Sequence, residues 1–398
     1  MLASLSLIFL VGLAMGAICQ KLKMPRIIGM LVTGIVLGPY VLDFLDPSIL
    51  SISSELRKLA LIIILLKAGL SLDLKDLKKA GRPAILMSFV PATCEIAGYI
   101  LFAPLLLGIN RIEAAVMGAV LGAVSPAVVI PRMVMLMEEK YGTKKAIPQM
   151  IMAGASCDDI FVIVLFTTFL SMAQGGSADI IDFVNIPVSI VLGILLGAVT
   201  GYGLYLFFET SYAHKHCVRN STKVIIVLGF SMLLVSIEGW LEGKVSVSGL
   251  IAVVSMACVI KIKSTASVSK RLSEKFGKLW IAAEVVLFVL VGAAVDIRYT
   301  LSAGIAAVFM IFIALIFRTV GVLICTIKTK LNIKERIFCV IAYLPKATVQ
   351  AAIGSVPLAA GLACGKIILS VAVLAIIITA PLGALGIDNT YKKLLEKE

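Results

Sequence analysis

The chain has 398 residues, of which 60% are hydrophobic and only 15% are charged, and its mean hydropathy is +1.09. Soluble domains carry about 25% charged residues, so this composition excludes most soluble enzymes and predicts an all-α polytopic protein of the lipid bilayer. The net charge of +13 could indicate a nucleic-acid partner, but the basic residues follow the loops between apolar segments, so we expect no nucleic acid. The eight cysteines contain no C-x-x-C pair, which predicts neither a disulfide framework nor a metal site, and we expect no cofactor.

Thirteen apolar segments are candidates for transmembrane helices, each of which needs about 20 apolar residues. They cover residues 2–20, 26–42, 54–72, 83–108, 112–136, 147–172, 186–208, 223–240, 246–261, 279–297, 300–326, 336–358 and 366–386. Of the 36 Lys and Arg residues, 27 lie in loops after odd-numbered segments or in the C-terminal tail, six lie on the other side and three lie within segments. Because cytoplasmic loops are enriched in Lys and Arg, the pattern predicts a multi-pass protein of the cell membrane with its C-terminus in the cytoplasm and its N-terminus outside.

Seven ionisable residues interrupt the apolar segments, although each costs at least about 2.5 kcal/mol at bilayer depth on insertion scales. They are Lys67, Glu95, Asp158, Asp159, Glu284, Arg318 and Lys346. Lys67 and Glu284 lie near segment ends, where their side chains can extend to the interface. The other five lie in the middle of segments and are candidates for function.

Asp158 and Asp159 are neighbours on one predicted helix, so their side chains point about 100° apart. One of them can pair with a buried cation while the other faces a water-filled cavity. Arg318 and Lys346 supply two positive charges for the three acids Glu95, Asp158 and Asp159, so one acid has no fixed partner. A carboxylate that binds either a proton or a metal cation is what ion/proton exchange requires. Counting charges does not identify the surplus acid, and the alternative is that Arg318 and Lys346 simply neutralise the aspartate pair.

Two segments contain helix breakers in their interiors. The fifth contains GAVSPAVVIP with Pro126, and the twelfth contains YLPKATVQAAIGSVP with Pro345. Proline frees backbone carbonyls, which at membrane depth must line a cavity or be buried in protein. The breaks fall within segments 4–6 and 11–13, and an odd shift of seven segments gives these triplets opposite topology, as in inverted-repeat transporters. The seventh segment carries Gly193, Gly197 and Gly201 at four-residue spacing, which fits either a hinge or a packing seam.

Three motifs, GAVSPAVVIP, GASCDD and YLPKATVQAAIGS, together resemble the NHA-type sodium/proton antiporters of the monovalent cation:proton antiporter superfamily. The string LIIILLKAGLSLDLKDLKK also resembles the third span of that subfamily, and the match runs from about residue 50 to 386. The resemblance implies 13 transmembrane helices in an inverted-repeat fold with two broken crossing helices. It also implies a homodimer that works by elevator-like alternating access. The implied division is scaffold at 1–81 and 211–298, core at 82–172 and 299–386, linker helix at 173–210 and cytoplasmic tail at 387–398.

By the same resemblance, transported Na+ or Li+ and H+ would compete for Asp159, with Asp158 beside it paired to a basic residue of the eleventh segment. Ser125 and the crossing around Lys346 would complete the site. The further residues that this implies for the broken helices are Pro126, Pro345, Thr348 and Gln350.

One position departs from the electrogenic bacterial relatives, which carry lysine where this chain has Arg318. Arginine does not lose its proton in proteins, so we expect exchange to be close to electroneutral. Alternatively, Glu95 pairs with Arg318 and leaves Asp158 free to titrate.

Four other functions are weighed against Na+/H+ exchange. A K+/H+ antiporter and a sodium-coupled symporter of an organic solute share the architecture and stay open. A channel would need a ring of repeated ligands, which the charge pattern does not offer. An intramembrane aspartyl protease would need two aspartates on facing helices, so we expect a transporter and not an enzyme.

Overall fold

The structure is a computed structural model that describes residues 1–22, 24–71, 74–175, 180–213, 218–241 and 247–398. Within these ranges the secondary structure is helical, apart from one isolated bridge between Tyr141 and Lys397. Nine helical stretches of the described residues are long and apolar enough to cross a membrane, by length and composition. The predicted class, a polytopic α-helical membrane protein, is therefore confirmed at this level.

The other four predicted segments coincide with shorter or less apolar helices. These are α2 (Arg26–Leu37), α4 (Ser53–Ser71), α12 (Gly249–Lys263) and the interrupted run α15 (Ile333–Ala342), α16 (Thr348–Ile353) and α17 (Val356–Ala359). The count of thirteen crossings stays a prediction.

Several of the predicted segments have different ends in the structure, among them the fourth and the last. The segment at 83–108 is divided between α5 (Leu74–Met87) and α6 (Val90–Leu107), because Pro91 lies in the first turn of α6 and cannot continue a preceding helix. The final helix, α18 (Gly365–Leu394), continues eight residues beyond the predicted end at 386. Tyr391 and Leu395 are buried there, so the predicted tail is largely ordered structure.

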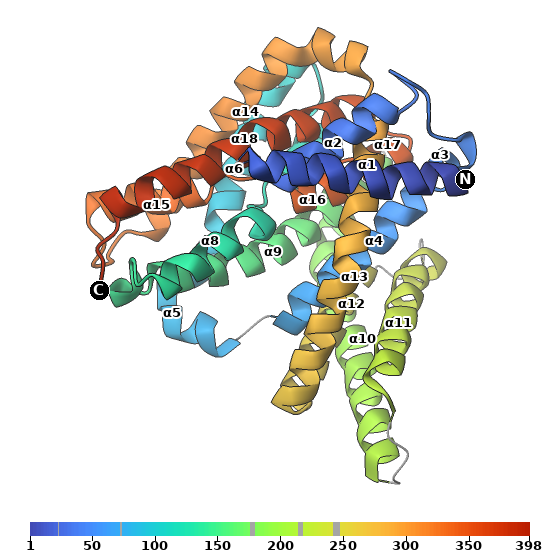
Figure 1. Cartoon of the computed structure of the whole chain (residues 1–398), viewed down its shortest axis with the longest axis vertical. Helices are drawn as coiled ribbons and strands as arrows, with labels where there is room; N and C mark the ends of the chain where they lie inside the picture. Colours follow the sequence, from blue (N-terminus) through green and yellow to red (C-terminus); the bar gives the residue numbers. More distant parts are fainter. Residues whose placement is uncertain (23, 72–73, 176–179, 214–217, 242–246) are drawn as a thin grey trace. The chain divides into compact units, whose positions relative to one another are not determined.

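The chain divides into two compact units. The first consists of Met1–Ser54, Asp73–Gln174 and Val285–Glu398, and the second consists of Glu55–Leu72 and Gly175–Glu284. In the second unit, α10 (Ile180–Ala213) packs along α12, and α11 (Asn220–Leu241) packs beside α12 (Figure 1).

The three spaced glycines of α10 form a packing seam. A Cβ atom added to Gly197 would lie 2.1 Å from the carbonyl oxygen of Ala252 on α12. The corresponding distances at Gly193 and Gly201, to backbone oxygens of the Ser248–Met256 stretch, are both 2.7 Å. Real Cβ atoms do not approach backbone so closely, so only glycine allows the two helices this contact. Of the two interpretations of the spacing, this geometry supports the seam.

In the first unit, α1 (Leu2–Lys21) packs on α2, and α6 packs along α14 (Ile297–Cys325). Two glycines bring α6 and α14 together: Gly98 of α6 lies against the ring of Phe317, and Gly321 of α14 lies against the backbone of Pro91. The two contacts flank the turn of α14 that carries Arg318. The close approach therefore places Arg318 beside α6.

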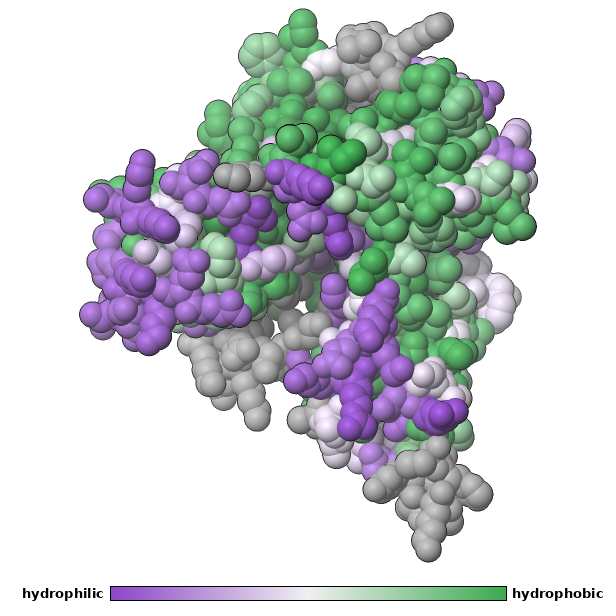
Figure 2. Space-filling view, in the orientation of Figure 1, coloured by the Kyte–Doolittle hydropathy of each residue, from purple (hydrophilic) through white to green (hydrophobic). Residues whose placement is uncertain are grey.

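The opposite side of α14 is an exposed apolar stripe with three- and four-residue spacing, formed by Ile305, Phe309, Phe312, Ile316, Val320 and Leu323. A helix with such a stripe outside and a charge inside fits a lipid-facing position. Figure 2 shows broad apolar areas on the surface.

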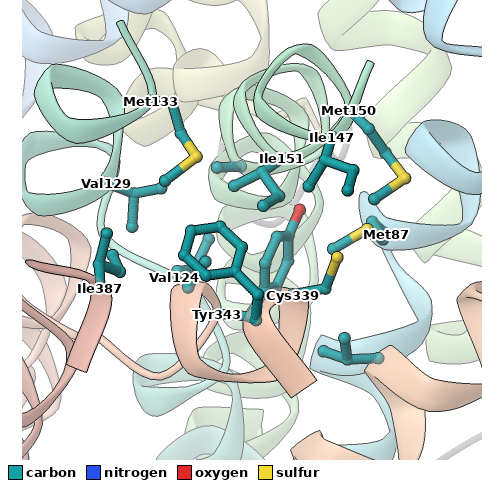
Figure 3. Close-up of a cluster of buried hydrophobic side chains, with 14 of the residues drawn as sticks. Met87, Val124, Val129, Met133, Ile147, Met150, Ile151, Cys339, Tyr343 and Ile387 are labelled. Carbon is teal, nitrogen blue, oxygen red and sulfur yellow. The ribbon is translucent and has the colours of Figure 1, made fainter. Parts of the chain in front are cut away.

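A buried apolar cluster fills the first unit between α8 (Pro126–Glu138), α9 (Ile147–Gly175), α15 and α18. Met133, Ile151, Cys339 and Tyr343 lie in it, and Figure 3 shows the ring of Tyr343 among these side chains. The cluster packs α8 and α15, one half of each interrupted helix, against α9, which carries the aspartate pair.

Candidate functional site

The candidate site is built around two helix interruptions. The first lies between α7 (Arg111–Leu121) and α8, which starts at Pro126, so that four residues separate the two helices. The second separates α15 from α16 and contains Pro345. The backbone N–H of Ser125 donates a 2.7 Å hydrogen bond to the carbonyl oxygen of Pro345, so the two interruptions are in contact.

Both interrupted helices begin in the same way. Asn110 and Glu113 form a reciprocal capping box at the start of α7, and Asn332 and Glu335 form one at the start of α15. An Asn three residues before a Glu is a recognised helix-start signal, and it precedes both breaks in the sequence.

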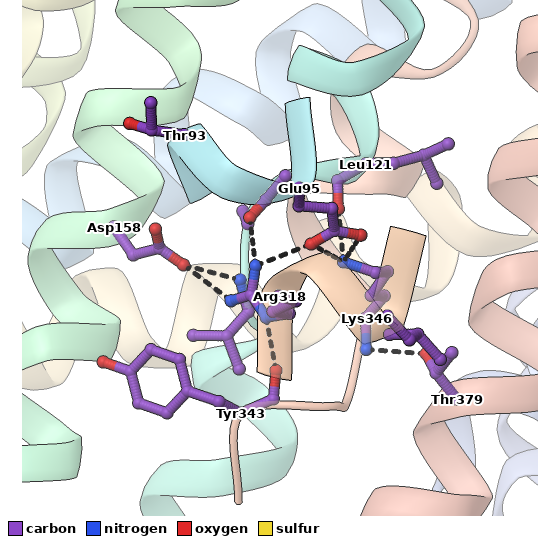
Figure 4. Close-up of polar contacts among 12 residues, drawn as sticks. Thr93, Glu95, Leu121, Asp158, Arg318, Tyr343, Lys346 and Thr379 are labelled. Atoms are coloured by element: carbon purple, nitrogen blue, oxygen red, sulfur yellow. Dashed lines mark hydrogen bonds and ion pairs between the residues drawn. The ribbon is translucent and has the colours of Figure 1, made fainter. Parts of the chain in front are cut away.

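Arg318 lies where the interruptions meet and is 1% exposed. Its guanidinium donates to Glu95 Oε2 at 2.8 Å and to Asp158 Oδ2 at 3.1 Å (Figure 4). It also donates to the carbonyl oxygens of Gly122 and Tyr343, at 2.5 and 2.6 Å. One side chain thus binds two carboxylates and a freed carbonyl from each interruption.

Lys346 lies in the second interruption and is completely buried. Its Nζ is 2.7 Å from Glu95 Oε1 and also donates to the carbonyl oxygen of Leu121. Its backbone N–H donates to Thr379 Oγ1 of α18 at 3.0 Å. Glu95 is therefore held between two cations, Arg318 and Lys346.

Gln350 of α16 joins the interruptions as a neutral clamp. Its Oε1 accepts from the backbone N–H of Ala347 at 2.8 Å, and its Nε2 donates to the carbonyl oxygen of Ala123 at 2.9 Å. In the first interruption, the N–H of Val124 donates to Asp158 Oδ2 at 2.8 Å. The carbonyls freed at 121–123 are thus occupied by side chains of this chain.

Asp159 differs from its neighbour. Among the described residues, no Lys, Arg or His nitrogen forms an ion pair with Asp159, and its Oδ1 is buried without a hydrogen-bond partner. Seven other buried side-chain oxygens have no hydrogen-bond partner in the described part of the chain. Three of them belong to Asp158 and to the residues at the N-terminal ends of α8 and α16: Asp158 Oδ1, Ser125 Oγ and Thr348 Oγ1. These oxygens are the candidates for holding a cation.

The structure brings together most of the residues that the sequence singles out. Glu95, Asp158, Arg318 and Lys346 form one hydrogen-bonded network, Gln350 spans the crossing, and Pro345 contacts the residue before Pro126. Lys67 and Glu284 belong to the second unit, and each has an interaction partner there or elsewhere.

Tyr343 and Thr379 also belong to the network, although they were not predicted from the sequence. Both are polar groups within apolar segments, and Tyr343 directly precedes the LPK motif. The position of Tyr343, directly before the LPK motif, could have indicated its role from the sequence.

The family described as "Sodium/hydrogen exchanger, transmembrane" matches residues 5–392. The chain is 34% identical over 387 residues to the sodium/hydrogen exchanger 9B2 of Homo sapiens, covering 94% of this chain and 70% of that protein. It is 30% identical over 418 residues to the human sodium/hydrogen exchanger 9B1, covering 100% of this chain and 78% of that protein. The fold is similar to that of the sodium proton antiporter MjNhaP1 from Methanocaldococcus jannaschii at pH 8, with a TM-score of 0.82 at 20% identity, over 99% of this chain and 98% of that one.

Proposed function

Since the chain belongs to the sodium/hydrogen exchanger family, as an NHA-type antiporter of the cation:proton antiporter superfamily, we propose that it exchanges Na+ or Li+ for H+ by alternating access. Cation and proton would compete for Asp159. Only the occupied carboxylate would let the site change the side of the membrane to which it opens, so that movement of one ion is coupled to movement of the other.

The observation that carries this proposal is the distribution of charge in the network. Arg318 and Lys346 are both within ion-pair distance of Glu95 or Asp158. Two buried cations are thereby matched by two acids, which satisfies the requirement that buried charges be paired. Asp159 is the acid left over, and a surplus carboxylate can take up either a proton or a cation.

We assign the cation ligands to Asp159 and to unpartnered oxygen atoms of its neighbour and of the helix interruptions. Hard cations bind oxygen, and Asp158 Oδ1, Ser125 Oγ and Thr348 Oγ1 are buried oxygens with free acceptor capacity within the described residues. The carbonyls of 121–123 already accept hydrogen bonds from Lys346, Arg318 and Gln350, so we leave them out of this ligand set.

The same geometry supports one-for-one, near-electroneutral exchange. Arg318 stays charged, and Asp158 accepts hydrogen bonds from Arg318 and from the N–H of Val124, so the partner of Asp158 in the network is a fixed cation. Glu95 does not replace Asp158 as the partner of Arg318, since the guanidinium binds both. One titrating carboxylate, Asp159, then exchanges one proton for each cation.

The remaining architectural proposals follow the family resemblance. They are thirteen crossings with an outside N-terminus, two inverted repeats, a core at 82–172 and 299–386, a linker at 173–210, scaffold helices at 1–81 and 211–298, and a homodimer in the cell membrane. The matched capping boxes and interruptions of α7–α8 and α15–α16 support the repeat.

Calorimetric titration of the purified protein with Na+, Li+ and K+, at several pH values and in buffers of different ionisation enthalpy, tests the proposal. We expect Na+ and Li+ to bind more weakly as the pH falls and to release about one proton per cation. Asp159→Asn is expected to abolish binding, whereas Asp388→Asn, a change to a surface acid paired with Arg132, leaves it intact. Binding that survives Asp159→Asn would contradict the assignment, and release of two protons would contradict one-for-one exchange. A response to K+ alone would make the protein a K+/H+ antiporter.

A further inference from the structure

Tyr343 ends α15 and touches Arg318 in two ways. Its carbonyl oxygen accepts the hydrogen bond from Arg318 Nε at 2.6 Å, and the centre of its ring lies 5.5 Å from the guanidinium carbon. The side chain is completely buried. Arg318 thus rests against both the backbone and the ring of this residue.

The other end of the Tyr343 side chain reaches α9. A Cβ atom added to Gly154 would lie 2.2 Å from the phenol oxygen and 3.4 Å from the ring carbon that carries it. The hydroxyl has no hydrogen-bond partner among the described residues, and it points into the apolar cluster near Ile151 and Met87 (Figure 3). The tyrosine therefore meets α9 through its shape and not through a hydrogen bond.

Gly154 and Asp158 are four residues apart, so they lie on the same face of α9, one turn from each other. Arg318 consequently has two connections to this face. One is direct, through Asp158 Oδ2, and the other passes through the ring of Tyr343 to Gly154.

We propose that Tyr343 is a positioning residue, a rigid spacer seated on Gly154 that holds Arg318 against Asp158 and so sets the cation affinity of Asp159. This inference rests on the proposed function. The guanidinium offsets the negative charge of Asp158, and a charge interaction at 3.1 Å in a buried site changes steeply with distance. If Arg318 moves away, more uncompensated negative charge remains beside Asp159, so the cation is held more tightly and released more slowly.

A size exchange between positions 154 and 343 tests the spacer. Gly154→Ala forces the tyrosine, and Arg318 with it, away from α9. We expect the apparent KM for Na+ at alkaline pH to fall by about fivefold or more, with a lower maximal rate. Tyr343→Phe leaves a small gap above Gly154, so Arg318 is no longer held firmly against Asp158, and KM is expected to fall by about twofold. In the double variant the new methyl fills the gap left by the hydroxyl, so KM should return to within about twofold of the wild-type value. The contact of the added methyl with Met87 Cβ, at 2.9 Å, persists in the double variant, so recovery reports on the phenol alone.

Gly386→Ala is the matched control. Its added methyl would press on Ile341 Cγ2 of the same half-helix at 2.7 Å, without reaching Tyr343. It should lower the melting temperature while leaving KM unchanged, which separates positioning from general overpacking. If Gly154→Ala does not fold, Tyr343→Leu takes its place, because it removes both the ring and the spacer and should lower KM in the same direction.

The proposal is overturned if the folded Gly154→Ala or Tyr343→Leu variant keeps the wild-type KM, or if the double variant is no closer to wild type than Gly154→Ala. Asp159→Ala is assayed in parallel. If it transports normally, the proposed function fails on its own, whatever the spacer variants do.

Discussion

Arg318 donates four hydrogen bonds, two to carboxylates and two to carbonyls of broken helices. Lysine, with a single nitrogen, could not bridge Glu95, Asp158 and both interruptions in this way. The residue that makes exchange electroneutral in our proposal is thus also the residue that joins the crossing. A single substitution there has structural and functional effects that need to be separated.

Arg318→Ala is expected to lower the free energy of unfolding by about 3–5 kcal/mol, because it leaves buried carboxylates without their partner. Thermal or denaturant unfolding in detergent measures this loss. Thr319→Ala is the control, and it should change stability little. Among the described residues that hydroxyl bonds only to Leu315 O, within its own helix, at 2.8 Å. An Arg318→Ala protein as stable as Thr319→Ala would show that the network contributes little to folding.

The sequence was informative about these charges because an ionisable residue stands out in an apolar segment. It was silent on the acceptors at Leu121, Gly122 and Ala123, because a carbonyl oxygen is present at every position. It also left the surplus acid undetermined. Adjacent residues differ by about 100° around a helix, and only the packed rotation of α9 turns Asp158, and not Asp159, toward Arg318.

At the scale of elements, hydropathy located the helices but not their ends. The fourth segment was predicted as a single run, whereas proline and packing divide it into α5 and α6. The twelfth was predicted to be interrupted at Pro345, and the structure divides it into α15, α16 and α17. Hydropathy reports which residues are apolar, and helix ends are set by capping, proline and tertiary contacts. The glycine spacing of α10 fitted either a hinge or a packing seam, and the position of α12 against these glycines favours the seam.

Gly197→Ala tests the α10–α12 seam. The added methyl meets the backbone at Ala252, which cannot move aside as a flexible side chain can, so we expect destabilisation of about 1–3 kcal/mol. Gly203→Ala, on the same helix, is the control, since a Cβ there has nothing within 4 Å among the described residues. It should be neutral or slightly stabilising through higher helix propensity. Equal effects of the two changes would contradict the seam.

A second element-scale contact fastens the turn after α8 to the start of α15. Lys145 Nζ donates to both oxygens of the buried Glu335 at 2.8 and 2.9 Å, and Gly142 N–H donates to the carbonyl of Glu396 at 2.9 Å. The hydrogen bond to Glu335 raises the pKa of Lys145 above its ordinary value of 10.5. The charged lysine therefore stabilises the folded state fully below pH 10.5, and this contribution is lost as the pH rises through the raised pKa.

Lys145→Ala should accordingly lower the melting temperature at neutral pH, and the difference from wild type should shrink only at pH values above 10.5. Melting curves across the pH range measure it. Lys144→Ala, a change to the exposed neighbour, should have little effect at any pH. A Lys145→Ala difference that disappears already near neutral pH would contradict the assigned pairing.

At the scale of the whole molecule, the family membership and the charge distribution lead to the same activity by separate routes. One route is similarity over most of the chain, and the other is the surplus acid beside a fully paired network. The family resemblance implies Asp159 as the competing carboxylate, and the network independently leaves the same residue without a cationic partner among the described residues. The network alone would not identify Na+. Their combination yields the central claim, that one carboxylate binds either a monovalent cation or a proton.

The most direct test is cation-induced proton movement in proteoliposomes that contain a trapped pH dye, with Asp159→Ala assayed beside the wild type. We expect a pH change on addition of Na+ or Li+ that is equally fast with the membrane potential clamped or free, and that is absent in the folded Asp159→Ala variant. A signal that survives Asp159→Ala, or no signal with any monovalent cation from folded wild-type protein, would contradict it.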